Sequence, residues 1–342
     1  MTARPRGGAR ALLPLGVATP FLYYGSKARV ASEIVSLLPP HRVYAEPFCG
    51  SAAVLFHKSP TPHEILNDRF GEVVNFFRVM RALAPQLAYA LRLTPYARDE
   101  FEDCRRDRFG PLDEPLERAR RFFVLTCQSV NATAAFRRSA WSAGQRQHTS
   151  RAHAAARRAD ALEAFAERLR SVTIENTDAL DVIDACDLPD AAIYVDPPYL
   201  RSTRTAGAYA HEFMTDGEHE ALAERLLAFS GAVVLSGYNS PLYSQLYGDW
   251  DRREIATRKS SANTHGQASS RAIEVIWSNR PIEQQQALWD RATDPPRRRR
   301  PFGAGGSCPT SAVGRRTSNG HATALPSVEP LRGRAAEHNR AA

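Results

Sequence analysis

The most chemically suggestive residues in the sequence are Asp196, Pro197, Pro198 and Tyr199, which directly follow the apolar segment 191–195. Two adjacent prolines remove two backbone donors and stiffen the turn, so the Asp196 carboxylate and the Pro197 carbonyl can face outward as fixed acceptors. Two neighbouring acceptors suit a planar amine with two hydrogens, and Tyr199 offers a flat face for a stacked base. An ordinary strand-ending turn also uses Asp and Pro, but the position after a buried strand favours a binding site.

Two further candidate groups follow apolar segments earlier in the chain. Segment 46–51 reads Glu-Pro-Phe-Cys-Gly-Ser, a small-residue turn in which Gly50 lets the backbone approach a ligand. The pattern Gly-x-Gly-x-x-Gly is not met, so pyrophosphate binding is poorly supported. Asp68 lies eighteen residues after Gly50, the place and spacing at which an acid accepts hydrogen bonds from ribose hydroxyls. A helix N-cap is the alternative for Asp68, and the preceding turn favours ribose binding.

The elements that position these residues alternate along the chain. Apolar segments typical of strands occur at 42–45, 64–66, 172–175, 191–195 and 232–235. Helical spacing occurs in segments 29–38, 71–83 and 216–229. Segments 253–257 and 272–277 predict the two strands of a closing hairpin. This alternation predicts a Rossmann-like α/β fold with a mostly parallel sheet covered on both faces. All three candidate groups fall at the carboxyl ends of strands, where such sheets bind their ligands.

Segment 85–170 interrupts this alternation with helical or loop patterns alone, such as 119–130 and 154–169. Within it, residues 118–159 contain nine arginines and no acidic residue, so this window carries +9 while the rest of 21–280 carries −9. The base composition of the source genome explains arginine in place of lysine, but it does not explain the absence of acids. Clustered arginines are the usual electrostatic footprint on DNA or RNA. We therefore expect a phosphate-binding surface on this insert.

The two ends of the chain differ from its body. Residues 1–20 carry three arginines without acids, and residues 281–342 carry ten arginines and five acids in a mixture of Gly, Ser, Pro and Ala, a composition that predicts disorder. No run of eighteen apolar residues exists and the start makes a poor secretory signal, so no membrane span is expected. The five cysteines, never spaced as Cys-x-x-Cys, fit a reducing cytoplasm without disulfides or structural zinc.

Residues 21–280 resemble the Dam-type family of adenine-specific DNA methyltransferases of bacteria and phages, with the motifs in the family's order. Segment 21–27 (Phe-Leu-Tyr-Tyr-Gly-Ser-Lys) is similar to the family's aromatic-x-Gly-Gly-Lys element, with a serine in place of the second glycine. Segment 46–51 is similar to the methyl-donor loop Glu-Pro-Phe-x-Gly, and 196–199 matches the catalytic tetrapeptide in full. The resemblance implies that S-adenosylmethionine is bound by Tyr23, Gly25, Lys27, Glu46, Pro47, Phe48, Gly50, Asp68, Asp178 and Asp196.

The resemblance is looser at two places. Asp178 ends a segment, 175–178, that is similar to the family's element flanking the donor adenine, and a helix cap explains this aspartate nearly as well. Segment 130–132 reads Val-Asn-Ala where the family often has Phe-Asn-Gly in its DNA-contacting insert. The family implies double-stranded DNA as the partner, and we expect the contacts to come from Asn131, Arg137, Arg138 and Arg146.

Other residues carry weaker signals. Phe136 and Trp141 lie in the arginine-rich window, where they either stack against bases or bury part of the insert's core. His211, Glu212 and His219 lack the His-Glu-x-x-His spacing and an evident third ligand, so no metal is expected.

The resemblance implies transfer of a methyl group from S-adenosylmethionine to the exocyclic 6-amino group of adenine, in a nucleotide extruded from duplex DNA. Hydrogen bonds from the amine to Asp196 and to the Pro197 carbonyl would free the nitrogen lone pair for attack. One alternative keeps the chemistry and changes the amine to that of cytosine, an RNA base or a glutamine side chain. A non-catalytic DNA-binding module is a second alternative, and a dehydrogenase is a third, disfavoured by the missing glycines.

These interpretations divide the chain into segments. Residues 1–20 form a disordered N-terminus, 21–84 and 171–280 the catalytic domain, 85–170 a helical target-recognition insert, and 281–342 a disordered basic tail. The sequence leaves open a cognate restriction enzyme as a partner, the oligomeric state and the recognised DNA word.

Overall fold

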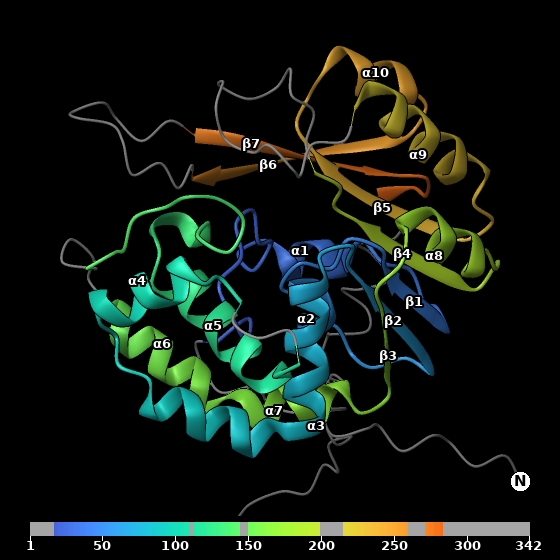
Figure 1. The fold of residues 1–342 in the computed structure, drawn as a ribbon. Coiled ribbons are helices and arrows are strands. Elements are labelled where there is room, and N and C mark those ends of the chain that lie inside the picture. The colour runs from blue at the N-terminus through green and yellow to red at the C-terminus, as the bar shows by residue number, and fades with distance from the viewer. Residues whose placement is uncertain (1–16, 110–112, 144–149, 199–214, 259–270, 283–342) are drawn as a thin grey trace, which may run out of the picture. The chain divides into compact units, whose positions relative to one another are not determined.

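Seven strands form one sheet in the computed structural model, which describes residues 17–109, 113–143, 150–198, 215–258 and 271–282 (Figure 1). The strand order is β3-β2-β1-β4-β5-β7-β6, and neighbours are parallel except for β7, which is antiparallel to β5 and β6. The strands are β1 (Val43–Glu46), β2 (His63–Asn67), β3 (Val172–Glu175), β4 (Ala191–Val195), β5 (Ala232–Gly237), β6 (Asp251–Arg258) and β7 (Arg271–Ser278). The predicted Rossmann-like α/β fold is confirmed, and each strand ends within two residues of its predicted segment.

The direction of strand addition reverses between β1 and β4. The chain proceeds outward from β1 to β2 and β3, and it then returns to place β4 on the other side of β1. Connections that leave β1 and β4 therefore diverge, and a crevice opens at the carboxyl ends of these two strands. Segments 46–51 and 196–198 follow these strands, so the topology brings the predicted donor loop and the predicted catalytic turn to one place.

Helices cover both faces of the sheet, and strand side chains alternate between two cores. Ala192 and Tyr194 belong to one core, whereas Ala191, Ile193 and Val195 belong to the other. The first core includes α1 (Ala31–Ser36), α2 (Ala53–His57), α3 (Gly71–Leu93), α5 (Pro115–Cys127) and α7 (Leu162–Leu169). The second includes α8 (Ala179–Ala185), α9 (Asp216–Ala228) and α10 (Pro241–Leu246) (Figure 1). Burial on both faces explains why the central strands read as continuous apolar runs.

Helix α3 continues to Leu93, although the sequence predicted its end near Leu83. Leu83 has a non-helical φ of −134° and ψ of 36°, and this kink accommodates Pro85, which lacks a backbone N–H and crowds the preceding turn. The helix therefore bends instead of ending. Helix α5 packs against the first half of α3, where Phe76 contacts Phe122 and Phe123, whereas Arg92 near the end of α3 pairs with Asp160 of α6.

The predicted insert is helical throughout the part that the structure describes, apart from turns, loops and one isolated bridge. Its helices α4 (Arg98–Arg106), α5 and α6 (Arg151–Asp160) lie along α3 or against one another, with the short helix η1 (Val130–Ala132) after α5 (Figure 1). The helix predicted at 154–169 is two helices, α6 and α7, which meet at Ala161. None of the helices in the described ranges has the length and apolar character needed to cross a membrane.

A buried ion cluster ties α7 to the sheet. Glu64 on β2 has no exposed side-chain surface and accepts hydrogen bonds from Lys58 Nζ at 2.6 Å and from Arg168 Nη1 at 2.5 Å. Arg168, on α7, also donates to the Leu55 carbonyl at 3.3 Å. A buried carboxylate depends on such partners for its solvation. The cluster therefore fixes the strand whose carboxyl end carries Asp68.

Replacing this carboxylate tests its importance for the fold. Glu64→Gln should lower the free energy of unfolding by about 3–5 kcal/mol, because it leaves buried cations without their anion. Urea denaturation followed by circular dichroism measures the change. Glu167→Gln removes the exposed partner of Arg170 and is the matched control, with an expected loss under about 1 kcal/mol. Equal, small losses in both variants would show that the buried cluster does not support the fold.

Candidate active site

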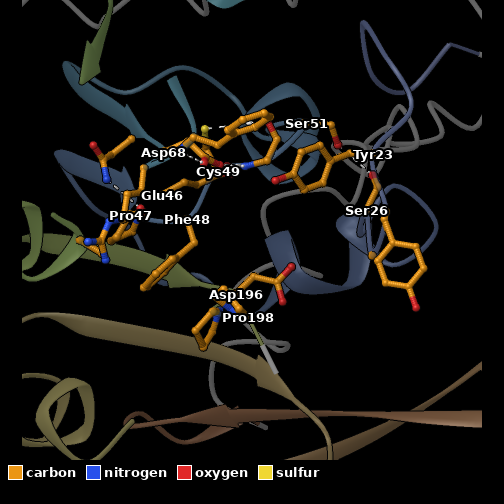
Figure 2. A pocket seen from close by; sticks show the side chains of 18 of the residues that line it. Tyr23, Ser26, Glu46, Pro47, Phe48, Cys49, Ser51, Asp68, Asp196 and Pro198 are labelled. Carbon is orange, nitrogen blue, oxygen red and sulfur yellow. Dashed lines mark hydrogen bonds between the residues drawn. The ribbon is translucent and has the colours of Figure 1, made fainter. Parts of the chain in front are cut away.

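A cavity of about 770 Å³ lies at the carboxyl edge of the sheet, within the size range of small-molecule sites. It is lined by all ten residues that the sequence predicted to bind the methyl donor: Tyr23, Gly25, Lys27, Glu46, Pro47, Phe48, Gly50, Asp68, Asp178 and Asp196. Pro197 and Pro198 line it as well. Figure 2 shows Asp196 and Pro198 across from the donor loop, residues 46–51. Segments far apart in the sequence thus form one site.

The donor loop turns sharply at Gly50, whose φ of 47° lies in the left-handed region. A Cβ atom here would lie 3.0 Å from two ring carbons of Tyr23, so the conformation and the close approach both require glycine. The same residue is held by Asp68, whose Oδ2 accepts the Gly50 N–H at 2.9 Å. Ser26, which replaces the family's second glycine, places its Oγ 2.8 Å from the Oγ of Ser51. That serine therefore contacts the end of the donor loop.

Asp68 is half-buried just after β2 and accepts two backbone N–H groups, from Gly50 and from Phe70, each at 2.9 Å. The N-cap residue of α3 is Phe70, so the helix-cap alternative for Asp68 is wrong. Burial raises the pKa of Asp68 to about 6, and the hydrogen bonds from Phe70 and Gly50 oppose this rise. The side chain is therefore mostly ionised at neutral pH. It holds the donor loop and lines the cavity at the same time.

Asn67 is a site residue that sequence reasoning missed. Its side chain donates to the Pro47 carbonyl at 2.9 Å and to the Thr177 carbonyl at 3.2 Å, and it accepts the Thr177 N–H at 2.9 Å. One buried amide thus links the segments that follow β1 and β3 to the end of β2. A polar residue at the end of an apolar strand is the signal that could have indicated it, since a buried amide needs several partners.

Glu46 ends β1 and is 1% exposed. Its Oε1 accepts the Tyr44 hydroxyl at 2.9 Å and the Leu55 N–H at 2.6 Å, so it ties β1 to α2. Burial raises the pKa of Glu46 to about 8, although both hydrogen bonds favour the charged form. At neutral pH the carboxyl group is therefore mostly protonated. Its neutral form keeps the floor of the cavity free of an uncompensated buried charge.

Lys27 and Asp196 form an ion pair in the cavity wall. Lys27 Nζ donates to the two Asp196 oxygens at 2.8 and 2.7 Å and to the Gly25 carbonyl at 3.1 Å, and Glu274 Oε1 lies 3.5 Å away. Burial lowers the pKa of Lys27, but the carboxylates of Asp196 and Glu274 outweigh burial and raise it above its ordinary value. The lysine is therefore charged at neutral pH. The sequence predicted Lys27 as a donor contact, and the structure adds its direct contact with the predicted catalytic aspartate.

For Asp178 the structure shows the helix cap, and donor binding stays a prediction. Asp178 is the N-cap residue of α8, and its Oδ1 accepts the Leu180 N–H at 2.9 Å. It also lines the cavity, together with Leu180. A capping role fixes the orientation of the side chain, and the cavity position makes it accessible to a ligand.

Aromatic residues of the predicted insert form part of the cavity wall. Phe109 and Phe136 line the cavity. The ring of Phe136 packs edge-on against Tyr23, with centroids 5.1 Å apart, and its centroid lies 5.2 Å from that of Phe70. Phe136 and Trp141 are both partly buried against the first core, so the packing interpretation holds for both rings.

Several arginines of the window 118–159 serve the structure of the insert. Arg118, Arg120 and Arg121 form ion pairs with carboxylates of α3, α4 and α5 that lie outside the window. These three of the nine arginines hold helices together, so the charge offered to a partner is smaller than the sequence suggested. Of the predicted DNA contacts, the structure describes the half-buried Asn131 and Arg137 and the exposed Arg138.

Some predicted residues fall elsewhere. Tyr199, Arg146, His211 and Glu212 lie outside the described residues. His219 is buried in α9, and its Nδ1 lies 3.1 Å from the Tyr243 hydroxyl, within hydrogen-bond distance. In the ranges that the structure describes, no group of His, Cys, Asp and Glu side chains has the arrangement of a metal site.

The fold and the cavity together define a Rossmann-like α/β protein with a ligand cavity at the carboxyl edge of its sheet. The model of the D12 class N6 adenine-specific DNA methyltransferase family matches residues 23–261, and the chain belongs to this family. No curated protein matches the sequence. A similar solved structure is the rRNA methyltransferase aviRa from Streptomyces viridochromogenes, at 14% identity and a TM-score of 0.30, with 80% of this chain and 90% of that chain covered. So distant a likeness carries no functional argument.

Family membership confirms the resemblance that the motifs indicated. The protein is an adenine-specific DNA methyltransferase, and S-adenosylmethionine is the methyl donor that its family implies. The dehydrogenase alternative is therefore set aside.

The pKa of Glu46 makes a prediction about stability. A folded-state pKa of about 8, above the ordinary value, means that the native state binds this proton more tightly than the unfolded chain does. The stabilising contribution is full below about pH 4, and it is lost as the pH rises toward about 8. Glu46→Gln cannot titrate, so its free energy of unfolding relative to wild type should increase between about pH 5 and about pH 8. Urea denaturation at several pH values measures this difference, and parallel curves for the two proteins would contradict the raised pKa.

Proposed function

We propose that the cavity binds S-adenosylmethionine beside the donor loop and admits the 6-amino group of an extruded adenine beside Asp196. The observation that carries this proposal is the Lys27–Asp196 pair, which lies in the wall of a cavity lined by every predicted donor-binding residue. The family supplies the reaction, and the geometry supports the assignment of roles to individual residues.

The chemistry of the cavity lining suits a nucleoside-containing donor. The Asp68 carboxylate accepts one N–H on each oxygen and has further acceptor sites for ribose hydroxyls. Asp178 supplies another carboxylate, and Phe48 and Leu180 supply apolar surface for a flat base. When bound, S-adenosylmethionine supplies a methyl group activated by the positive charge of its sulfonium.

Asp196 can receive an amine while it remains paired with Lys27. A carboxylate offers about four acceptor sites, and Lys27 uses one on each oxygen. The Asp196 side chain is 20% exposed and lines the cavity, so the carboxylate is accessible to a ligand. The Pro197 carbonyl serves as a second acceptor. Hydrogen bonds from both amine hydrogens favour a pyramidal nitrogen whose lone pair is no longer delocalised into the ring.

The target base must leave the duplex to reach this cavity, which costs a few kcal/mol of lost stacking and pairing. Tyr199 stacks on the extruded base, and Arg137, Arg138 and Arg146 bind the neighbouring phosphates. Two observations support this role for the insert: Arg138 is exposed, and the adjacent Phe136 lines the cavity. The segment that contacts DNA is thereby continuous with the wall of the active site.

Double-stranded DNA is the substrate partner under this proposal, and the cytoplasm of a bacterial cell is the compartment in which the enzyme meets it. The four cysteines that the structure describes are all unpaired thiols, as a reducing compartment requires.

Removing the acceptor charge tests the role of Asp196. Asp196→Asn should lower kcat for methylation of duplex DNA by at least about 100-fold, because the amide loses the charge that favours a positive nitrogen. Binding of S-adenosylhomocysteine, followed by calorimetry, should persist. Mass detection of N6-methyladenine measures the product. Asp190→Asn, at the opposite end of β4 with a 53% exposed side chain, is the matched control and should remain active. A fully active Asp196→Asn enzyme would refute the assignment.

The DNA surface is tested by the salt dependence of binding. Replacing Arg137, Arg138 and Arg146 by glutamine should weaken binding and reduce the slope of log K against log salt by about 0.9 per lost phosphate contact. Fluorescence anisotropy of a labelled duplex measures the slope. Arg42→Gln, 71% exposed beside the amino end of β1, should leave it unchanged. An unchanged slope in the triple variant would place the phosphate contacts elsewhere.

A further inference from the structure

Strand β7 brings a second acidic residue to the edge of the sheet where Asp196 lies. Because β7 is antiparallel to β5, its early residues pair with the carboxyl end of β5, and Val275 lies opposite Gly237. Glu274 precedes Val275 and therefore lies at this same edge. Side chains alternate between the two faces of a sheet along a strand, so Glu274 lies on the same face as Ile276. Ile276 belongs to the core that contains α1. Lys27 lies in the segment that leads into α1.

The surroundings of Glu274 are those of a buried charge with a defined partner. Glu274 is 6% exposed, and its Oε1 lies 3.5 Å from Lys27 Nζ. An ion pair between Arg253 on β6 and Glu33 on α1, at 3.2 Å, holds the hairpin against the helix that follows Lys27. A carboxylate removed from water to this extent needs a compensating cation. Lys27 provides it.

We propose that Glu274 is a positioning residue for methyl transfer, which acts through Lys27 on Asp196. This inference rests on the proposed roles of Lys27 and Asp196. The ammonium group of Lys27 lies between two carboxylates, so its position on Asp196 depends on attraction from both sides. Glu274 thereby helps to fix the orientation of the Asp196 carboxylate.

Glu274 also sets the formal charge of the cluster. Lys27, Asp196 and Glu274 together carry one positive and two negative charges, a net charge of −1. As the amine lone pair forms the new C–N bond, the methyl–sulfur bond breaks with its electrons on sulfur, and the nitrogen becomes positively charged. The nitrogen then loses one proton to water. The negative charge that Glu274 adds beside Lys27 and Asp196 stabilises the developing positive charge on nitrogen.

The groups that face this cluster come from each neighbouring strand end. The pKa of Lys27 is raised by three of them, Asp196 after β4, Glu274 on β7 and Tyr238 after β5. Two more, Tyr194 on β4 and Glu46 on β1, lie near Asp196. Burial lowers the pKa of Lys27, and the carboxylates of Asp196 and Glu274 raise it. Loss of the Glu274 charge therefore allows Lys27 to lose its proton at a lower pH.

Steady-state kinetics of the full-length Glu274→Gln enzyme tests the proposal. We expect kcat for DNA methylation to fall about 10–100-fold with little change in KM for S-adenosylmethionine. The decline of kcat at alkaline pH should begin at a lower pH than in wild type, which a merely structural role would not produce. Glu254→Gln, at an exposed position of β6 in the same hairpin, is the matched control and should resemble wild type. Wild-type kcat and an unshifted pH profile in Glu274→Gln overturn the proposal.

Two further variants separate positioning from loss of folding. Glu274→Asp keeps the charge and should recover most of the kcat lost in Glu274→Gln, and no recovery contradicts the proposal. In a Lys27→Met enzyme, the additional change Glu274→Gln should cause no further loss of kcat. If the double variant instead loses kcat by the product of the two single losses, Glu274 does not act through Lys27. A different result would refute the proposed function itself, namely full methylation activity in the Asp196→Asn enzyme.

Discussion

The active site depends on one ion pair between residues that are 169 positions apart in the chain, Lys27 and Asp196. The pair forms only if the segment before α1 crosses the carboxyl edge of the sheet, and only if the turn after β4 points toward that segment. The reversal of strand order between β1 and β4 satisfies both conditions. The ion pair in turn holds a carboxylate at the cavity wall, where the proposed function places the amine of the target base.

Around this pair, the carboxyl ends of the strands are joined by buried polar contacts. Asn67 links the segments after β1 and β3, and Asp68 holds the donor loop at Gly50. On the same strand, Glu64 connects β2 to α7, where the predicted insert returns to the sheet. Buried polar groups with several partners rigidify a structure, because breaking one bond leaves the others unsatisfied. A rigid edge of this kind positions donor and acceptor groups without loss of entropy at the moment of reaction.

The strands, the sheet and the residues that line the cavity could be predicted from the sequence, because apolar runs and short motifs at strand ends are local signals. The type and position of Asn67 gave a local signal but not its partners, which depend, like the place of Glu274, on which strands become neighbours. Glu274 is a lone acid between Ile273 and Val275, and only the antiparallel pairing of β7 brings it to Lys27. The continuation of α3 past Pro85 depends on packing against the insert. Ion pairs of the arginine window, such as Arg118 with Glu72, could not be predicted either, because they join residues distant in sequence.

The most direct test of this account is a crystal structure of the enzyme with S-adenosylhomocysteine and a duplex that contains its target adenine. The account predicts that the 6-amino nitrogen lies within hydrogen-bonding distance of an Asp196 oxygen while Lys27 still contacts the same carboxylate. An extruded adenine whose amine contacts other groups, with Asp196 turned away from it, would contradict the account.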